Sequence, residues 1–247
     1  MITTLLFDFG STLDGPAYWL DRFVAQYRIA DIPVTRAELD PAYEHARQAT
    51  SRARRVVERF GFTELVRMLV GQQIEFLAET GPEAIRATLR ALDSRGRYRV
   101  GERITALFVE QSRSGMQKSL TDLEALKPRY RIGVVSNWYG NLDRIIAEAG
   151  MAKLVGAVAD SARLGFGKPD PRIFQAALKS LGAAPAQAAM IGDSLEKDCV
   201  PARGLGLKTV WYCPMSDTAD WHARRDQGSA SADYVVADLE EIAELKL

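Results

Sequence analysis

The sequence predicts an α/β fold, a doubly wound parallel sheet interrupted by an all-helical insertion, and three observations support this. Residues 2–8 are an apolar, β-branched run of the kind that forms a buried strand. Residues 16–128 show amphipathic helical patterns and no convincing strand. From residue 131, strand-like runs alternate with helical segments, which is typical of a parallel sheet with helices on both faces. We therefore expect one domain from residues 1–14 and 129–247, and a helical domain from 15–128.

The helices of the insertion are predicted from apolar spacing and from start signals. Residues 16–30 place aromatic and aliphatic side chains at helical intervals. Thr35 and Glu38 match a capping box, which predicts a long helix running toward residue 60. Further helices are predicted at residues 62–79, 82–92, 101–113 and 116–127.

The alternating segment predicts the remaining strands of the sheet and the helices that cover it. Asp170 followed by Pro171 is a typical helix start. The predicted strands are 132–136, 154–159, 188–192, 209–212 and 234–236. The predicted helices are 141–149, 170–182, 197–205 and 238–246.

Composition sets broad limits on function. The chain has 247 residues, of which 47% are hydrophobic and 26% charged, as in an ordinary soluble protein. Its net charge of zero gives no general attraction to nucleic acid or to an anionic membrane, so neither is expected as a partner. No apolar stretch approaches the roughly 20 residues of a membrane span, and no basic region precedes the first strand, so no signal peptide is expected.

Cysteine and histidine usage narrows the setting further. The chain has two cysteines and two histidines, which makes a metal site built from these residues improbable. Two cysteines in a chain of this length favour a reducing, cytoplasmic location. The sequence leaves open whether the protein is a monomer or a homodimer.

Four polar signals follow strands of the predicted sheet. They are Asp8 with Thr12, Ser136 with Asn137, Lys168 in Gly-Lys-Pro-Asp, and Asp193 with Asp198. Because parallel strands end at the same edge of a sheet, we expect these groups to converge there.

This set of groups suits phosphoryl transfer. Asp8, Asp193 and Asp198 are hard oxygen donors of the kind that Mg²⁺ prefers, and their mutual repulsion calls for a cation. Lys168 and the Ser136 hydroxyl suit the oxygens of a phosphoryl group. Asp8 can then act as the nucleophile that forms an aspartyl-phosphate.

The four motifs, in this order and at strand ends, resemble the haloacid dehalogenase-like hydrolase superfamily, which carries a helical cap after its first motif. The resemblance covers the whole chain. It implies that Asp8 is the nucleophile and that Lys168 stabilises it together with the transferring group. It implies that Thr12 and Ser136 bind phosphate or orient the nucleophile, and Asn137, next to Ser136, is a further candidate for phosphate binding. It implies a Mg²⁺ site formed by Asp8, Asp193, Asp198 and the backbone carbonyl of Gly10.

Gly10 departs from the pattern of phosphatases in this family. An Asp at this position protonates the leaving group and activates water in those enzymes, work that is typically worth about 10²–10⁴-fold in rate. Gly10 keeps the carbonyl and lacks the acid. Its presence predicts slow turnover, substrates with good leaving groups, a substitute acid or a lost activity. Asp14 is the nearest substitute, although a role at a hinge or at the entry to the cap fits it better.

The leading functional hypothesis is a Mg²⁺-dependent phosphatase of small phosphorylated metabolites. A 2-haloacid dehalogenase also lacks the second Asp but needs no metal, whereas this chain keeps Asp193 and Asp198. A phosphonoacetaldehyde-type hydrolase needs a lysine in the cap, and no lysine precedes Lys118. A catalytically impaired binding or regulatory homologue is the non-enzymatic alternative.

Two further features are each open to two interpretations. Trp138 and Tyr139 either line the pocket or belong to the core. Arg52, Arg55 and Arg59, expected on one helical face, either bind a substrate anion or form a solvated charged surface, and the second interpretation is favoured.

Overall fold

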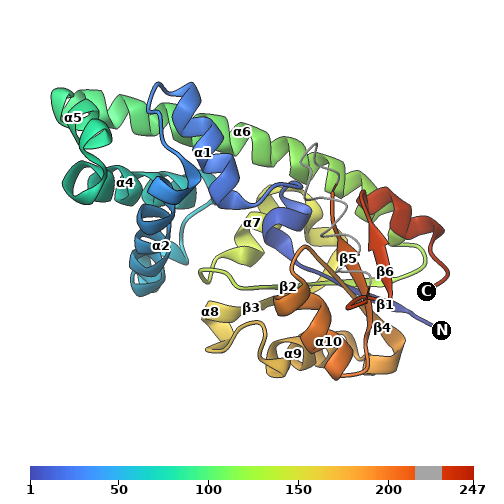
Figure 1. Cartoon of the computed structure of the whole chain (residues 1–247). Helices are drawn as coiled ribbons and strands as arrows, with labels where there is room; N and C mark the ends of the chain where they lie inside the picture. The colour runs from blue at the N-terminus through green and yellow to red at the C-terminus, as the bar shows by residue number, and fades with distance from the viewer. Residues whose placement is uncertain (215–229) are drawn as a thin grey trace. The chain divides into compact units, whose positions relative to one another are not determined.

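The computed structural model describes residues 1–214 and 230–247, which form two compact units. One unit comprises Met1–Pro16 with Ser114–Leu247, and the other comprises Ala17–Arg113. The helical unit thus ends at Arg113, whereas the sequence predicted its end at residue 128. The reason is α6 (Ser94–Leu126), a continuous helix that contributes its first part to one unit and its last part to the other (Figure 1).

The unit Ala17–Arg113 is all-helical, as predicted. Its helices are α1 (Trp19–Ile29), α2 (Arg36–Arg52), α3 (Arg54–Val57), α4 (Phe62–Thr80), α5 (Glu83–Ala91) and the first part of α6. The capping box of Thr35 and Glu38 is confirmed at the start of α2. Two predictions are wrong: α2 ends at Arg52, well before residue 60, and Ser114 and Gly115 do not divide α6 into two helices.

The other unit is built on a six-stranded, fully parallel sheet in the order β3-β2-β1-β4-β5-β6, which confirms the predicted fold class. The strands are β1 (Thr4–Phe7), β2 (Arg131–Ser136), β3 (Val155–Asp160), β4 (Ala188–Gly192), β5 (Lys208–Tyr212) and β6 (Tyr234–Val236). The helices are α7 (Leu142–Glu148), α8 (Ser161–Leu164), α9 (Pro171–Leu181) and α10 (Val200–Gly204). Shorter helical turns are η1 (Phe9–Leu13), η2 (Met151–Lys153), η3 (Pro185–Gln187), η4 (Leu195–Cys199) and η5 (Leu239–Glu244).

The sheet is covered on both faces, which explains why β1 and β4 are buried throughout. Leu6, Val135 and Met190 on three neighbouring strands pack in one cluster with Phe174 of α9. In Figure 1, α9 and α10 lie on one side of the sheet and α7 lies on the other. Asp170 caps α9 as predicted, by accepting the backbone N–H of Arg172 at 2.9 Å.

The strand order decides where the polar motifs meet. β1 lies between β2 and β4, and it pairs with both. The residues after these three strands are therefore neighbours at one edge of the sheet, where the direction of strand succession reverses and α/β proteins bind ligands. Within the described part of the chain, no helix has the length and hydropathy needed to cross a membrane.

Candidate active site

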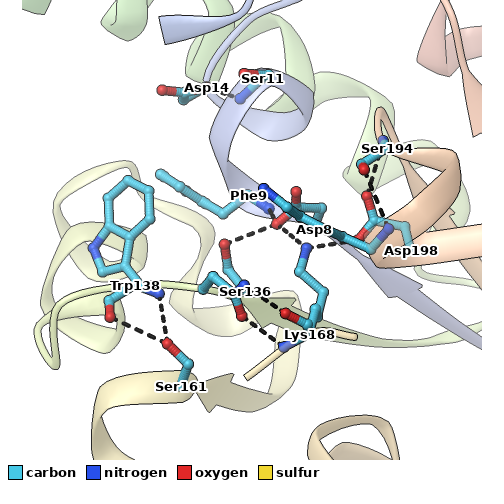
Figure 2. Close-up of polar contacts among 12 residues, drawn as sticks. Asp8, Phe9, Ser11, Asp14, Ser136, Trp138, Ser161, Lys168, Ser194 and Asp198 are labelled. Atoms are coloured by element: carbon cyan, nitrogen blue, oxygen red, sulfur yellow. Dashed lines mark hydrogen bonds and ion pairs between the residues drawn. The ribbon is translucent and has the colours of Figure 1, made fainter. Parts of the chain in front are cut away.

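Asp8 follows β1 directly and is held by three donors. Its Oδ1 accepts the backbone N–H of Phe9 at 2.7 Å and the Ser136 hydroxyl at 2.8 Å, and pairs with Lys168 Nζ at 2.7 Å (Figure 2). None of the described residues donates to Oδ2. One carboxylate oxygen therefore anchors the side chain, and the other remains available for chemistry.

Lys168 is a buried cation shared by two carboxylates. Its Nζ lies 2.7 Å from Asp8 Oδ1 and 2.6 Å from Asp198 Oδ1 (Figure 2). Burial by itself lowers the pKa of Lys168, but the charges of Asp198 and Asp8 outweigh burial and raise the pKa above its ordinary value. Lys168 consequently stays protonated at neutral pH, so it stabilises negative charge but does not release a proton.

The side chain of Asn137 positions Lys168 through two hydrogen bonds to its backbone. Its Nδ2 donates to the Lys168 carbonyl at 2.8 Å, and its Oδ1 accepts the Lys168 N–H at 2.7 Å. A Cβ at Gly167 would lie 2.4 Å from Asn137 Oδ1, so a glycine is needed there. A contact between Asn137 and phosphate is thus left to its backbone N–H.

Asp193 and Asp198 complete the cluster. Oxygen atoms of Asp8, Asp193 and Asp198 lie within 4.8 Å of one another. Asp198 Oδ2 accepts the backbone N–H of Ser194 at 3.0 Å, and Trp211 Nε1 donates to the Asp193 carbonyl at 2.9 Å. The second contact escaped the sequence analysis because it depends on β5 lying beside β4.

Asp193 and Asp198 of this cluster have raised pKa values. Burial is the largest cause for Asp193, followed by the charge of Asp8, and together they raise its pKa to about 8. Burial raises the pKa of Asp198 to about 6 although Lys168 opposes the shift. Of the three negative charges, Lys168 offsets one. Without a bound cation, ionisation of all three carboxylates is therefore unfavourable.

The residues present fit Mg²⁺. The three carboxylates offer hard oxygen atoms, which this ion prefers. The Thr12 hydroxyl is buried and makes no hydrogen bond with any described residue, so it has capacity for a phosphate oxygen or for the nucleophile. Both observations match a site for a phosphate held beside a cation.

Gly192 allows Asp198 to reach this site. A Cβ at Gly192 would lie 2.4 Å from Asp198 Oδ2, and Asp198 is held by Lys168 and by Ser194. We expect Gly192→Ala to lower the free energy of unfolding by about 1–3 kcal/mol, because a fixed and fully buried side chain must move. Denaturant unfolding measures the change.

Gly204→Ala is the matched control for this substitution. Apart from its chain neighbours and the backbone of α10, no atom lies within 4 Å of the Cβ position at Gly204. We expect its stability to stay equal or to rise by up to about 1 kcal/mol. A Gly192→Ala protein as stable as the Gly204→Ala protein would contradict the argument from close approach.

Two aromatic residues after β2 and one aspartate at the end of β3 are also buried. Trp138 and Tyr139 are buried, and Trp138 packs edge-on against Phe9 with ring centroids 5.0 Å apart. Asp160, missed by the sequence analysis, accepts the backbone N–H groups of Gly140 and Leu142 and so fixes the loop after β2. Its place at the end of β3 was the available signal.

Arg52, Arg55 and Arg59 do not lie on one face of a single helix, so the prediction of a shared helical face is wrong. The helix breaks at Ala53, and α3 ends at Val57. Arg52, Arg55 and Arg59 are exposed and line a pocket of about 800 Å³. That they form a solvated charged surface rather than an anion site stays a prediction.

The cysteines and histidines make no metal cluster among the described residues. Cys199 and Cys213 are both free and buried. The His45 ring lies tilted against that of Phe76 in the helical unit, and His222 lies outside the described residues.

Comparison with known proteins decides the family. The family model for haloacid dehalogenase-like hydrolases matches residues 2–206, which include all four motifs. The chain belongs to this family. The membership predicted from Asp8, Ser136, Lys168 and Asp193 is thereby confirmed, and the protein is a haloacid dehalogenase-like hydrolase.

Relatives of this hydrolase include phosphatases. It is 34% identical over 170 residues to a phosphoserine phosphatase of Thermus thermophilus, across 67% of this chain and 66% of that protein. It is 37% identical over 82 residues to a glyceraldehyde 3-phosphate phosphatase of Pyrococcus furiosus, across 33% of this chain and 32% of that protein. These matches span less than two thirds of the relatives' own lengths.

Solved structures share the fold of this hydrolase. A phosphatase of the family from Thermococcus onnurineus superposes with a TM-score of 0.54 at 20% identity, covering 98% of this chain and 97% of that chain. An L-2-haloacid dehalogenase from Xanthobacter autotrophicus superposes with a TM-score of 0.53 at 16% identity, covering 99% and 98%. At these identities the likeness establishes the fold and does not separate the two activities.

Proposed function

We propose that this hydrolase is a Mg²⁺-dependent phosphatase of small phosphorylated metabolites that works through an aspartyl-phosphate on Asp8. The observation that carries the proposal is the cluster of buried Asp8, half-buried Asp193 and buried Asp198, whose oxygens lie within 4.8 Å of one another. Lys168 offsets one of the three negative charges. We assign the three carboxylates and the Gly10 carbonyl as the oxygen ligands. The phosphatase relatives support the same reaction class.

The first half-reaction is an attack by Asp8. Ser136, Lys168 and the Phe9 N–H hold Oδ1, so Oδ2 forms the bond to phosphorus while the bond from phosphorus to the ester oxygen breaks. The leaving alcohol then needs one proton. Lys168, Thr12 and the Asn137 N–H provide donors for the phosphoryl oxygens, whereas the Ser136 hydroxyl keeps its one hydrogen on Asp8 Oδ1. Mg²⁺, when bound, supplies positive charge that offsets the charge of the phosphoryl group.

The second half-reaction restores Asp8. Water attacks the phosphorus of the aspartyl-phosphate, the bond between phosphorus and Oδ2 breaks, and inorganic phosphate leaves with one proton from that water transferred to solvent or to a base. Gly10 has no side chain to take this proton, and Lys168 stays protonated. Proton transfer therefore limits the rate at this site. We expect phosphate esters with good leaving groups to be hydrolysed fastest.

A metal-independent 2-haloacid dehalogenase is the second candidate, and Gly10 is the observation that favours it. The cluster argues against it, because three carboxylates beside a single lysine call for a cation, which a metal-independent enzyme does not hold. A binding homologue is disfavoured by Lys168, since an inactive site does not need a buried ammonium that two carboxylates share.

The deciding experiment is a substrate panel run with Mg²⁺ or with a chelator. We expect p-nitrophenyl phosphate, which has a good leaving group, to be hydrolysed with Mg²⁺ and not with the chelator. Phosphoserine and glyceraldehyde 3-phosphate belong in the panel because relatives carry these names. Halide release from a 2-haloacid in the chelator, with no phosphate release in Mg²⁺, would overturn the proposal.

The raised pKa values of Asp193 and Asp198 predict how stability depends on pH. The unfolded chain releases these protons near pH 3.8, whereas the folded protein keeps them to about pH 6 and about pH 8. The folded state thus binds more protons within this window, so metal-free protein loses stability as pH rises from about 4 to about 8. Lys168 adds no pH dependence to stability in this window, because it stays protonated in both the folded and the unfolded state.

Mg²⁺ relieves this loss, since it binds the ionised carboxylates in place of their protons. We expect the increase in Tm on adding Mg²⁺ to grow between about pH 5 and about pH 8. Thermal unfolding at several pH values, with Mg²⁺ or with a chelator, measures it. An increase that is the same at every pH would contradict this assignment of the carboxylates, and Asp193→Asn should remove most of the pH dependence.

A further inference from the structure

Asp14 is a fully buried carboxylate that the reaction described above does not use. Its Oδ1 accepts the backbone N–H of Ser11 at 2.7 Å, and its own N–H donates to the Phe9 carbonyl at 3.1 Å (Figure 2). The two contacts close the turn η1 from both sides. Gly10, which we assign as a metal ligand through its carbonyl, lies inside this turn.

The Ser11 N–H and the Gly10 carbonyl belong to the same peptide group. Among the described residues the cis peptide bond is Lys168–Pro169, so the bond between Gly10 and Ser11 is trans. In a planar trans peptide, the hydrogen and the oxygen point in opposite directions. Holding the N–H toward Asp14 therefore turns the Gly10 carbonyl away from Asp14. Figure 2 shows Asp14 and Ser11 together on one side of the turn and Asp8 on the other.

The backbone of this turn needs support. Ser11 has φ 61° and ψ 9°, in the left-handed region that costs a non-glycine residue about 1–2 kcal/mol. The hydrogen bond from the Ser11 N–H to Asp14 Oδ1 offsets such a cost. The contact from Asp14 thus helps to retain the conformation that presents the Gly10 carbonyl.

We propose that Asp14 is a positioning residue for the cation, which orients and polarises the Gly10 carbonyl. A carboxylate that accepts the N–H of a peptide increases the negative charge on the carbonyl oxygen of that peptide. A more negative oxygen is a better ligand for a hard cation. Since Gly10 contributes no side chain, this peptide group is its whole contribution to the site. The inference rests on the proposed Mg²⁺ site and adds a residue outside it.

The test compares Mg²⁺ binding to wild-type protein, Asp14→Asn and Asp14→Ala by isothermal titration calorimetry. Residues that orient metal ligands typically contribute about 10-fold or more in affinity. We expect the Kd for Mg²⁺ to rise about 10-fold in Asp14→Ala, which loses the acceptor. Asp14→Asn keeps an acceptor oxygen and loses the charge, so we expect an intermediate rise of about 3-fold. The Mg²⁺ concentration for half-maximal p-nitrophenyl phosphate hydrolysis should follow the same order.

Asp233→Ala is the matched control. Asp233 also accepts a backbone N–H, from Thr209 at 2.9 Å, but at the amino end of β5, the edge of the sheet away from the cluster. We expect this variant to lose stability without a change in Kd. The same Kd in folded Asp14→Asn as in wild-type protein overturns the inference, and it does so even when Asp14→Ala fails to fold. Absence of Mg²⁺ binding to wild-type protein instead overturns the proposed metal site.

Discussion

Asp8→Asn is expected to reduce the hydrolysis of p-nitrophenyl phosphate to the background of the assay. An asparagine amide has nearly the shape of the carboxylate, and its oxygen can still accept the Phe9 N–H and the Ser136 hydroxyl. It does not act as a nucleophile toward phosphorus, so the step that forms the aspartyl-phosphate is lost. Removal of a nucleophile can cost about 10⁶-fold in kcat, which places the variant below detection for a slow enzyme.

The measurement is the initial rate in saturating Mg²⁺, with Tm recorded to show that the variant is folded. Asp143→Asn serves as the control, because Asp143 is an exposed carboxylate paired with Arg163 in the same unit. We expect this control to keep the wild-type rate. A folded Asp8→Asn protein with the wild-type rate would show that Asp8 is not the nucleophile.

Gly10→Asp is expected to increase turnover by about 10²–10⁴-fold, the usual contribution of a positioned acid and base. The backbone at Gly10 has φ −67° and ψ 132°, which any L-residue adopts without strain. The new carboxyl group stands in the turn that follows Asp8, where the leaving oxygen and the attacking water both need a proton carrier. The gain should be largest for alkyl phosphates, whose leaving groups depend most on a proton.

Gly10→Asn is the matched control, since its side chain has the size of aspartate and transfers no proton. Rates with p-nitrophenyl phosphate and with an alkyl phosphate, measured for both variants, separate an acid–base effect from a change in shape. Trapping with ³²P-labelled substrate should give more aspartyl-phosphate in wild-type protein than in Gly10→Asp, because the slow second step is relieved. Equal rates in the folded wild-type, Gly10→Asp and Gly10→Asn proteins would mean that proton transfer does not limit turnover by this enzyme.

Local patterns in the sequence were sufficient for most of the fold. Apolar runs of strand length alternating with helices predicted a parallel sheet, and the helical stretch before them predicted the insertion. The capping residues Thr35 and Asp170 marked helix starts correctly because capping depends on neighbours three residues away or nearer. Helix ends were less certain. Ala53 ends α2 without a glycine or proline signal, and α6 continues through Ser114 and Gly115.

The identities of the reactive groups also followed from the sequence, since Asp8, Ser136, Lys168 and Asp193 each stand in a short motif at a strand end. Their arrangement did not. Only the strand order brings the loops after β1, β2 and β4 together, and only side-chain geometry shows that three donors hold Asp8 Oδ1. Asn137 and Asp14 illustrate the difference, because their contacts with Lys168 and Ser11 depend on where side chains point. Motifs report which groups a local segment contains, whereas hydrogen bonds between separate segments depend on the packing of the whole sheet.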